Sequence, residues 1–174
     1  ASVQATRKYL LRLHALYEME AISGLSPSIK MDREVLLGTL DRRLEILGTY
    51  TSDKQYLLGI RRAAMQLSNL EFTKLDLASS WLISSKLARK ADFISTAHNA
   101  VLHATQLGDD AARIEHSRLL WKEGQHRKAI QSLEGAIAVN AFRSYDFGSV
   151  TESASTTGDR EKLQNFLAAR AHVL

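Results

Sequence analysis

Residue types that could bind a metal or transfer a proton are scattered along this chain and do not gather into a motif. The six histidines are His14, His98, His103, His116, His126 and His172. A zinc site on a helix needs two histidines four residues apart with a supporting carboxylate, and no pair here has that spacing. Cysteine is absent, which excludes thiolate metal sites and disulfides. The sequence therefore predicts no metal site and favours histidines that are ordinary surface or interior side chains.

One short run of residues matches part of a nucleotide site. Asp146, Phe147 and Gly148 spell the D-F-G of protein kinases, in which the aspartate holds magnesium against the ATP phosphates. A kinase site also needs a glycine-rich loop, a lysine on a strand and a catalytic loop, and none of these precedes Asp146. We interpret the three residues as a coincidence. The segment is predicted to be noncatalytic, with no catalytic residue, cofactor or metal of its own.

Basic residues occur in short pairs that do not form a continuous track. Lysine and arginine number 23 against 19 acidic residues, for a net charge of +4. Arg42 and Arg43, for example, are flanked by Asp41 and Glu45. Nucleic-acid binding requires a contiguous surface that neutralises phosphates, so direct binding of this kind is our least favoured hypothesis. No apolar run approaches the roughly 20 residues of a membrane span, so we expect no membrane contact.

The elements that must position these residues are predicted to be helices. Apolar residues recur at steps of three or four, as in Leu10, Leu13 and Tyr17, in Leu36, Leu40, Leu44 and Leu47, and in Tyr56, Ile60, Ala63 and Leu67. Seven helices are predicted before residue 141. The first ends at Gly24 and the seventh begins after Gly124. The five between them span Asp32 to Leu47, Ser52 to Ser68, Thr73 to Ala91, Ser95 to Gln106, and Asp109 to Glu123. A last helix begins at Asp159, after an exposed and mobile loop over 141–158 that is rich in Ser, Thr and Gly.

Local signals support several of these helix ends. Ser52 followed by Gln55 resembles a capping box, and Asp32 and Thr73 can cap their helices. Gly48 follows Leu47 at the position of a C-cap glycine. The seventh helix is predicted to carry Ala129, Ile130, Leu133, Ala136 and Ile137 on its buried side.

An internal repeat with an offset of 32 residues is the most specific structural signal in the sequence. Superimposing Ala97 on Ala129 also aligns Asp92 with Gly124, Val101 with Leu133, and Ala104 with Ala136. A small residue followed by an apolar one at +4 and a small one at +7 is typical of the second helix of a tetratricopeptide unit. The predicted repeat core consists of Trp81, Ala97, Val101, Ala104, Leu120, Trp121, Gly124, Ala129, Leu133 and Ala136.

The predicted fold class is therefore all-α, an α-solenoid of stacked antiparallel helical hairpins of the tetratricopeptide or HEAT type. With 45% hydrophobic and 24% charged residues, the chain can form one solenoid segment and is not disordered. Residues 1–174 are interpreted as a single segment, and the two clearest hairpins lie in 73–140. The alternation of helices alone leaves open whether the chain is a scaffold within a larger protein or a free-standing tetratricopeptide-type adaptor for protein interactions.

Two blocks of sequence resemble a known family. Leu87 to Ala104 reads LARKADFISTAHNAVLHA, and Ile114 to Leu133 contains the pattern E-x-S-x-x-L-W-x-x-G followed by A-I-x-x-L. Both are similar to the FAT region of the phosphatidylinositol 3-kinase-related protein kinases, and most like the fungal form of the ATR-type DNA-damage checkpoint kinases. Both blocks lie within residues 81–140, a stretch of about a third of the chain. Ser117 replaces the usual alanine and Asp92 the usual glycine.

The resemblance implies a role beyond what spacing shows. In that family the FAT region is an α-solenoid that clasps the kinase domain, joins it to a HEAT-repeat arm of the same chain, and contributes to dimer contacts. The parent polypeptide would be a nuclear serine/threonine kinase of the DNA-damage checkpoint, using ATP with magnesium or manganese and an ATRIP-type subunit. None of the family's catalytic residues falls in this chain, so the resemblance implies a noncatalytic scaffold.

Overall fold

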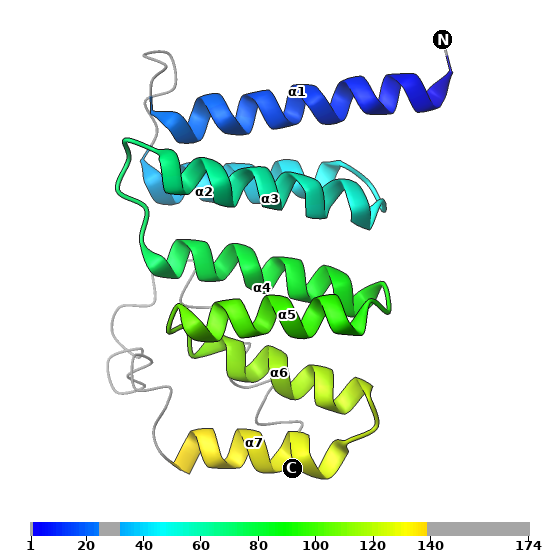
Figure 1. The fold of residues 1–174 in the computed structure, drawn as a ribbon, viewed down its shortest axis with the longest axis vertical. Coiled ribbons are helices and arrows are strands. Elements are labelled where there is room, and N and C mark those ends of the chain that lie inside the picture. The colour runs from blue at the N-terminus through cyan, green and yellow to red at the C-terminus, as the bar shows by residue number, and fades with distance from the viewer. Residues whose placement is uncertain (1, 25–31, 139–174) are drawn as a thin grey trace, which may run out of the picture. The chain divides into compact units, whose positions relative to one another are not determined.

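The structure is a computed structural model that describes residues 2–24 and 32–138. Within these residues the chain forms seven α-helices and no strand (Figure 1). They are α1 (Val3–Ser23), α2 (Arg33–Ile46), α3 (Thr51–Leu67), α4 (Lys74–Lys90), α5 (Ile94–Gln106), α6 (Ala111–Lys122) and α7 (His126–Ala138). The prediction of an all-α fold is confirmed. The loop predicted over 141–158, the helix predicted from Asp159, the D-F-G residues and His172 lie outside the described residues.

The helices belong to two compact units, each considered by itself. The first unit contains α1 to α5, the second contains α6 and α7, and the division falls between Asp109 and Asp110. In the first unit α1 packs on α3, α3 on α4, and α4 on α5, whereas in the second α6 packs on α7. Three-residue loops join α4 to α5 and α6 to α7, so both pairs are helical hairpins. This packing agrees with the predicted class of stacked helical hairpins.

A left-handed residue at equivalent positions links the two hairpins to the sequence repeat. Gly124 ends α6 with φ +79, a backbone conformation that glycine adopts without steric cost. Asp92, which the repeat aligns with Gly124, follows α4 and has φ 64. Residues with a Cβ disfavour this left-handed region, because the Cβ approaches the following carbonyl oxygen too closely. Asp is one of the few residues that visits it. The same turn therefore closes the first helix of both hairpins, with Asp92 in one and Gly124 in the other.

The helix starts confirm one predicted cap and correct another. Thr73 Oγ1 accepts a hydrogen bond from Asp76 N at 3.2 Å, and Asp76 Oδ2 accepts one from Thr73 N at 2.7 Å, which is a complete capping box. The capping box predicted at Ser52 and Gln55 is wrong. Helix α3 begins at Thr51, so Ser52 lies within its first turn, and Gln55 Nε2 instead donates to the backbone carbonyl of Ser84 at 2.7 Å.

Two apolar clusters hold the first three helices of the first unit together. One consists of Ala21, Ile22, Leu36, Leu40 and Met65. The other consists of Ala15, Leu44, Leu57 and Leu58. Each cluster joins α1, α2 and α3, and side chains from α4 pack against both. Because a fully buried leucine contributes about 1.5–3 kcal/mol relative to an exposed one, these clusters stabilise the packing of α1, α2 and α3.

The apolar residues that mark α3 as a helix in the sequence are not the ones that it buries. Tyr56 is 50% exposed and Leu67 is 86% exposed. The buried residues of α3 are Leu57, Leu58, Arg61 and Met65. An arginine therefore occupies the centre of the buried face, which requires partners for its charge.

Candidate functional site

The predicted repeat core lies mainly in the interior of the two hairpins. Ala97, Val101 and Ala104 are buried on α5, and Ala129, Leu133 and Ala136 are buried on α7. Their small or compact side chains allow α5 to approach α4, and α7 to approach α6. Ser85, opposite Ala97, donates a hydrogen bond from Oγ to the Ala97 carbonyl at 3.0 Å, which fixes the distance between α4 and α5.

Some residues predicted in the core lie at its edge or outside it. Trp81, Leu120 and Ile130 are only partly buried. Trp121 is 44% exposed and Ile137 is 38% exposed, so the prediction of a buried position is wrong for both. Trp121 stands in the last turn of α6, where its ring lies 4.3 Å from the ring of His126 at the start of α7. It therefore covers the turn of the hairpin and does not enter the core.

A buried charged network joins the first three helices. We name it the Arg61 network; it consists of Glu18 on α1, Asp41 on α2 and Arg61 on α3. Arg61 Nε and Nη2 donate to the two carboxylate oxygens of Glu18 at 3.0 and 2.9 Å, and Arg61 Nη1 donates to Asp41 Oδ1. Arg61 and Glu18 are 1% and 2% exposed. The two parallel hydrogen bonds match the fork of the guanidinium to the carboxylate, a geometry that lysine could not reproduce.

Electrostatics keep Arg61 charged in this position. Burial by itself lowers the pKa of Arg61, but the hydrogen bonds and charges of Glu18 and Asp41 outweigh burial, and the net direction is upward. Its cationic form is therefore the one that the fold stabilises. Sequence reasoning missed this network because Arg61 and Glu18 are 43 residues apart and each is individually a polar residue on an amphipathic helix.

The neighbouring arginine makes contacts of a different kind. Arg62 Nη1 donates to Ser84 Oγ at 2.8 Å, and its guanidinium lies 3.8 Å over the ring of Trp81. Burial, together with the charge of Arg61, lowers the pKa of Arg62 to about 10. The ring of Trp81 also stacks on His103 of α5, with centroids 4.2 Å apart. Trp81 therefore connects α3, α4 and α5 through its two stacking partners.

Further contacts attach α1 to the rest of the unit. Arg7 donates to both carboxylate oxygens of Asp53 at 2.6 and 2.8 Å, and this interaction raises the pKa of Arg7 and lowers that of Asp53. His14 Nδ1 lies 3.4 Å from Arg43 Nη2. Burial lowers the pKa of His14, the Arg43 charge lowers it further, and Glu18 opposes both effects. These groups hold helices together and do not pair a nucleophile with a base.

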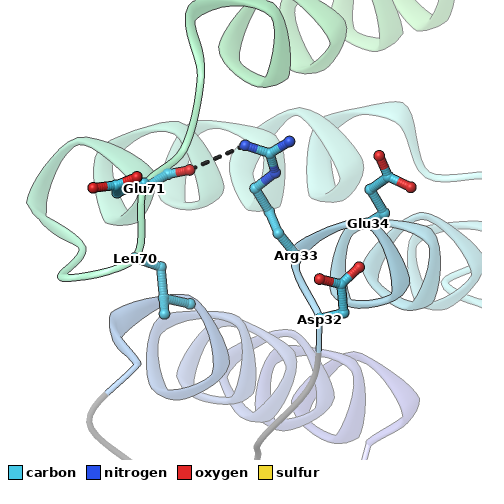
Figure 2. Close-up of a pocket in the computed structure, with 5 residues that line it drawn as sticks. All are labelled: Asp32, Arg33, Glu34, Leu70 and Glu71. Carbon is cyan, nitrogen blue, oxygen red and sulfur yellow. Dashed lines mark hydrogen bonds between the residues drawn. The ribbon is translucent and has the colours of Figure 1, made fainter.

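Figure 2 shows an open pocket beside the turn that precedes α4, lined by Asp32, Arg33, Glu34, Leu70 and Glu71. Arg33 Nη1 donates to the Glu71 carbonyl at 3.1 Å, and its Nε lies 3.6 Å from Asp76 Oδ2. The one cation of the pocket is thus already engaged in tying the start of α2 to the α3–α4 turn. We interpret the pocket as a place where helices are joined, not as a ligand site.

The described residues provide neither a metal site nor a membrane span. Over 2–24 and 32–138, no group of three or more His, Cys, Asp or Glu side chains is placed so that it could hold a metal ion. None of the helices in that part of the chain combines the length and apolar character that a membrane span requires.

Comparison with known proteins finds sequences similar to this chain within several protein kinases. It is 28% identical to the serine/threonine-protein kinase MEC1 of Eremothecium gossypii over 127 residues, which are 73% of this chain. It is 30% identical to the protein kinase rad3 of Schizosaccharomyces pombe over 133 residues, or 76% of this chain. It is 24% identical to the serine/threonine-protein kinase ATR of Drosophila melanogaster over 169 residues, or 84% of this chain.

The matched regions are a small part of each relative. They span 5% of MEC1, 5% of rad3 and 6% of the Drosophila kinase. No solved structure matches the chain. The FAT domain family matches it over residues 1–174, which confirms the resemblance stated from the two sequence blocks. The chain therefore belongs to the FAT domain family, as it occurs in kinases of the MEC1, rad3 and ATR type.

Proposed function

We propose that this chain is a noncatalytic scaffold segment of an ATR-like serine/threonine kinase in DNA-damage checkpoint signalling. The observation that carries the proposal is the FAT match over the whole chain, combined with relatives that are kinases about twenty times longer than the matched region. The segment would position the kinase domain and support dimer contacts. The free-standing adaptor, our alternative, receives no support from these relatives.

The packing of the first unit suits a mechanical role. The Arg61 network ties α1, α2 and α3 together, and Trp81 connects α3, α4 and α5. A displacement at one end of such a unit is transmitted through packed helices, because close-packed interiors deform little. Regulation would then act by shifting how the hairpins pack against their partners in the kinase.

The remaining parts of the proposal concern the longer polypeptide. Its kinase domain would bind ATP with magnesium or manganese, outside this chain. The partners of the segment would be that kinase domain, the HEAT arm of the same chain and an ATRIP-type subunit. The protein would act in the nucleus. Direct binding of nucleic acid by this segment is not part of the proposal, because its basic pairs are interrupted by acidic residues.

The test compares variants of the full-length kinase. Glu18→Ala removes the buried partner of Arg61, whereas Glu45→Ala, at an exposed position on α2, is the matched control. We expect Glu18→Ala to lower phosphorylation of a peptide substrate and Glu45→Ala to leave it unchanged. The double substitution Glu18→Leu/Arg61→Met, which replaces the buried pair by apolar groups, should restore activity.

Two results would refute the scaffold role. One is turnover of ATP by the isolated 174-residue chain above the level of a buffer control. The other is full kinase activity in the Glu18→Ala enzyme when proteolysis shows that its α1–α5 unit has opened.

A further inference from the structure

Helix α1 carries an apolar stripe on the side opposite to its buried face. The buried residues of α1 are Ala15, Glu18, Ala21 and Ile22. Tyr9, Leu13 and Leu16, which follow one another at steps of four and three, are 67%, 60% and 59% exposed. On a helix these steps place side chains in one line, so the three residues form a continuous surface that we name the outer stripe.

The outer stripe is larger than the scattered apolar residues of an ordinary surface. Leu10 and Met19 lie beside it and are 51% and 40% exposed. Single exposed apolar residues need no explanation, but a row of them along two helical turns marks a contact surface. A helix that is apolar on two opposite sides is typical of one that packs on both sides.

The position of α1 in its unit shows why the stripe is uncovered. Among the described helices of the first unit, α1 packs on α3, which packs on α4, which packs on α5, so α1 is the end of the series (Figure 1). In stacked helical proteins a true terminal helix has a polar outer face, because each unit otherwise needs a neighbour to bury its apolar side. The outer face of helix α1 instead exposes Tyr9, Leu13 and Leu16 in one line, with the exposed carboxylate of Glu20 at the end of that line, as expected of a helix that packs on both sides.

The charges beside the stripe indicate what kind of helix would pack there. Lys8 and Arg12 are exposed along one flank of the outer stripe, and neither has an ion-pair partner among the described residues. An amphipathic helix with acidic residues next to its apolar face would complement both the stripe and these cations.

We propose that the outer stripe is the docking surface for an amphipathic helix, with acidic residues beside its apolar face, supplied by the segment that precedes Ala1 in the longer polypeptide. The inference rests on the proposed function, which places this chain in a longer kinase. The matched regions are 5–6% of the relatives, so the longer chain has ample sequence to supply the helix. Helices adjacent in sequence usually pack together, which favours the preceding segment over a distant one.

The absence of cysteine makes site-specific labelling a clean test. Leu13→Cys reports on the outer stripe, and Leu102→Cys, which replaces a side chain 55% exposed on α5, is the matched control. Each variant is made in the 174-residue chain and in a chain extended at its N-terminus by its own preceding ~40 residues, about one helical hairpin. The measurement is the rate of maleimide labelling under native conditions.

The expected result is slower labelling of Leu13→Cys in the extended chain by about tenfold or more, since a packed site reacts only through local opening. Leu102→Cys should react at similar rates in both chains. Lys8→Glu/Arg12→Glu in the extended chain should restore fast labelling at Leu13→Cys, because the acidic flank would then be repelled. If labelling of Leu13→Cys in that variant remained as slow as in the extended parent, the proposal that the docking helix carries an acidic flank would be refuted.

Three other outcomes would overturn the docking proposal. Equal labelling of Leu13→Cys in both chains would show that the preceding segment does not cover the stripe. Protection already present in the 174-residue chain would assign the stripe to another part of this chain, or, if it grew with protein concentration, to a second copy. None of these readouts depends on kinase activity, so the scaffold role and the docking surface can fail separately.

Discussion

The Arg61 network leads to a prediction whose size follows from its geometry. Glu18→Ala removes both hydrogen bonds of the fork and leaves Arg61, whose side chain is 2% exposed, with Asp41 alone. Loss of one partner from a buried ion pair costs about 3–5 kcal/mol, because the remaining charge stays out of water. Asp41 has a side chain that is 47% exposed, so its contribution resembles that of a surface pair, and Asp41→Ala should cost about 1 kcal/mol or less.

The assay is urea denaturation followed by the fluorescence of Trp81. Trp81 lies in the first unit and stacks on Arg62 and His103, so its emission should change when α3, α4 and α5 separate. All variants carry Trp121→Phe, which removes the only other tryptophan of the chain at an exposed position. The free energy of unfolding is obtained by linear extrapolation to zero urea.

A double substitution separates the cost of a lone charge from the value of the pair. Glu18→Leu/Arg61→Met should be within about 1 kcal/mol of the parent chain or more stable, because apolar replacement of a buried pair is often neutral or favourable. The reasoning is refuted if Glu18→Ala and Asp41→Ala cost the same. It is also refuted if the double substitution is as unstable as Glu18→Ala.

Three further predictions concern the second hairpin and the pH dependence of the first unit. Leu133→Ala should destabilise the α6–α7 unit by about 2–5 kcal/mol through lost burial and a cavity, measured by thermal unfolding; a negligible shift would contradict its buried position. Gly124→Ala should cost about 1–2 kcal/mol because φ is +79 and a Cβ would meet no neighbour, so only backbone strain acts. Gly135→Ala, in the interior of α7 and also with open space around it, should instead stabilise by about 0.5–1 kcal/mol; equal effects of the two alanines would refute the backbone argument. The pKa of His14 in the folded chain lies below its ordinary value of 6.5. The imidazole of the unfolded chain therefore binds a proton more readily, and the free energy of unfolding should fall as the pH drops below about 6.5. Urea denaturation at several pH values should show a weaker decline for His14→Gln, and an identical pH profile would exclude this residue as the cause.

The sequence by itself determined the helices, the hairpins and the family. Steps of three and four between apolar residues specify helices locally, and glycines such as Gly124 specify where a helix must stop, because both effects act over a few residues. The repeat aligns Asp92 with Gly124, and the structure gives both residues a positive φ. The resemblance to the FAT family was also recognisable from the sequence, since it depends only on the order of residues along the chain.

Only the tertiary structure decided which helix face is buried and which polar residues enter the core. Local periodicity on α3 marked Tyr56 and Leu67, yet Arg61 lies inside because Glu18 and Asp41, far apart in sequence, converge on it. Trp121 has the residue type of a core position but lies at the end of its helix against His126. Burial of a charge or a large ring depends on which partners meet it in space, and spacing along one helix carries no information about those partners.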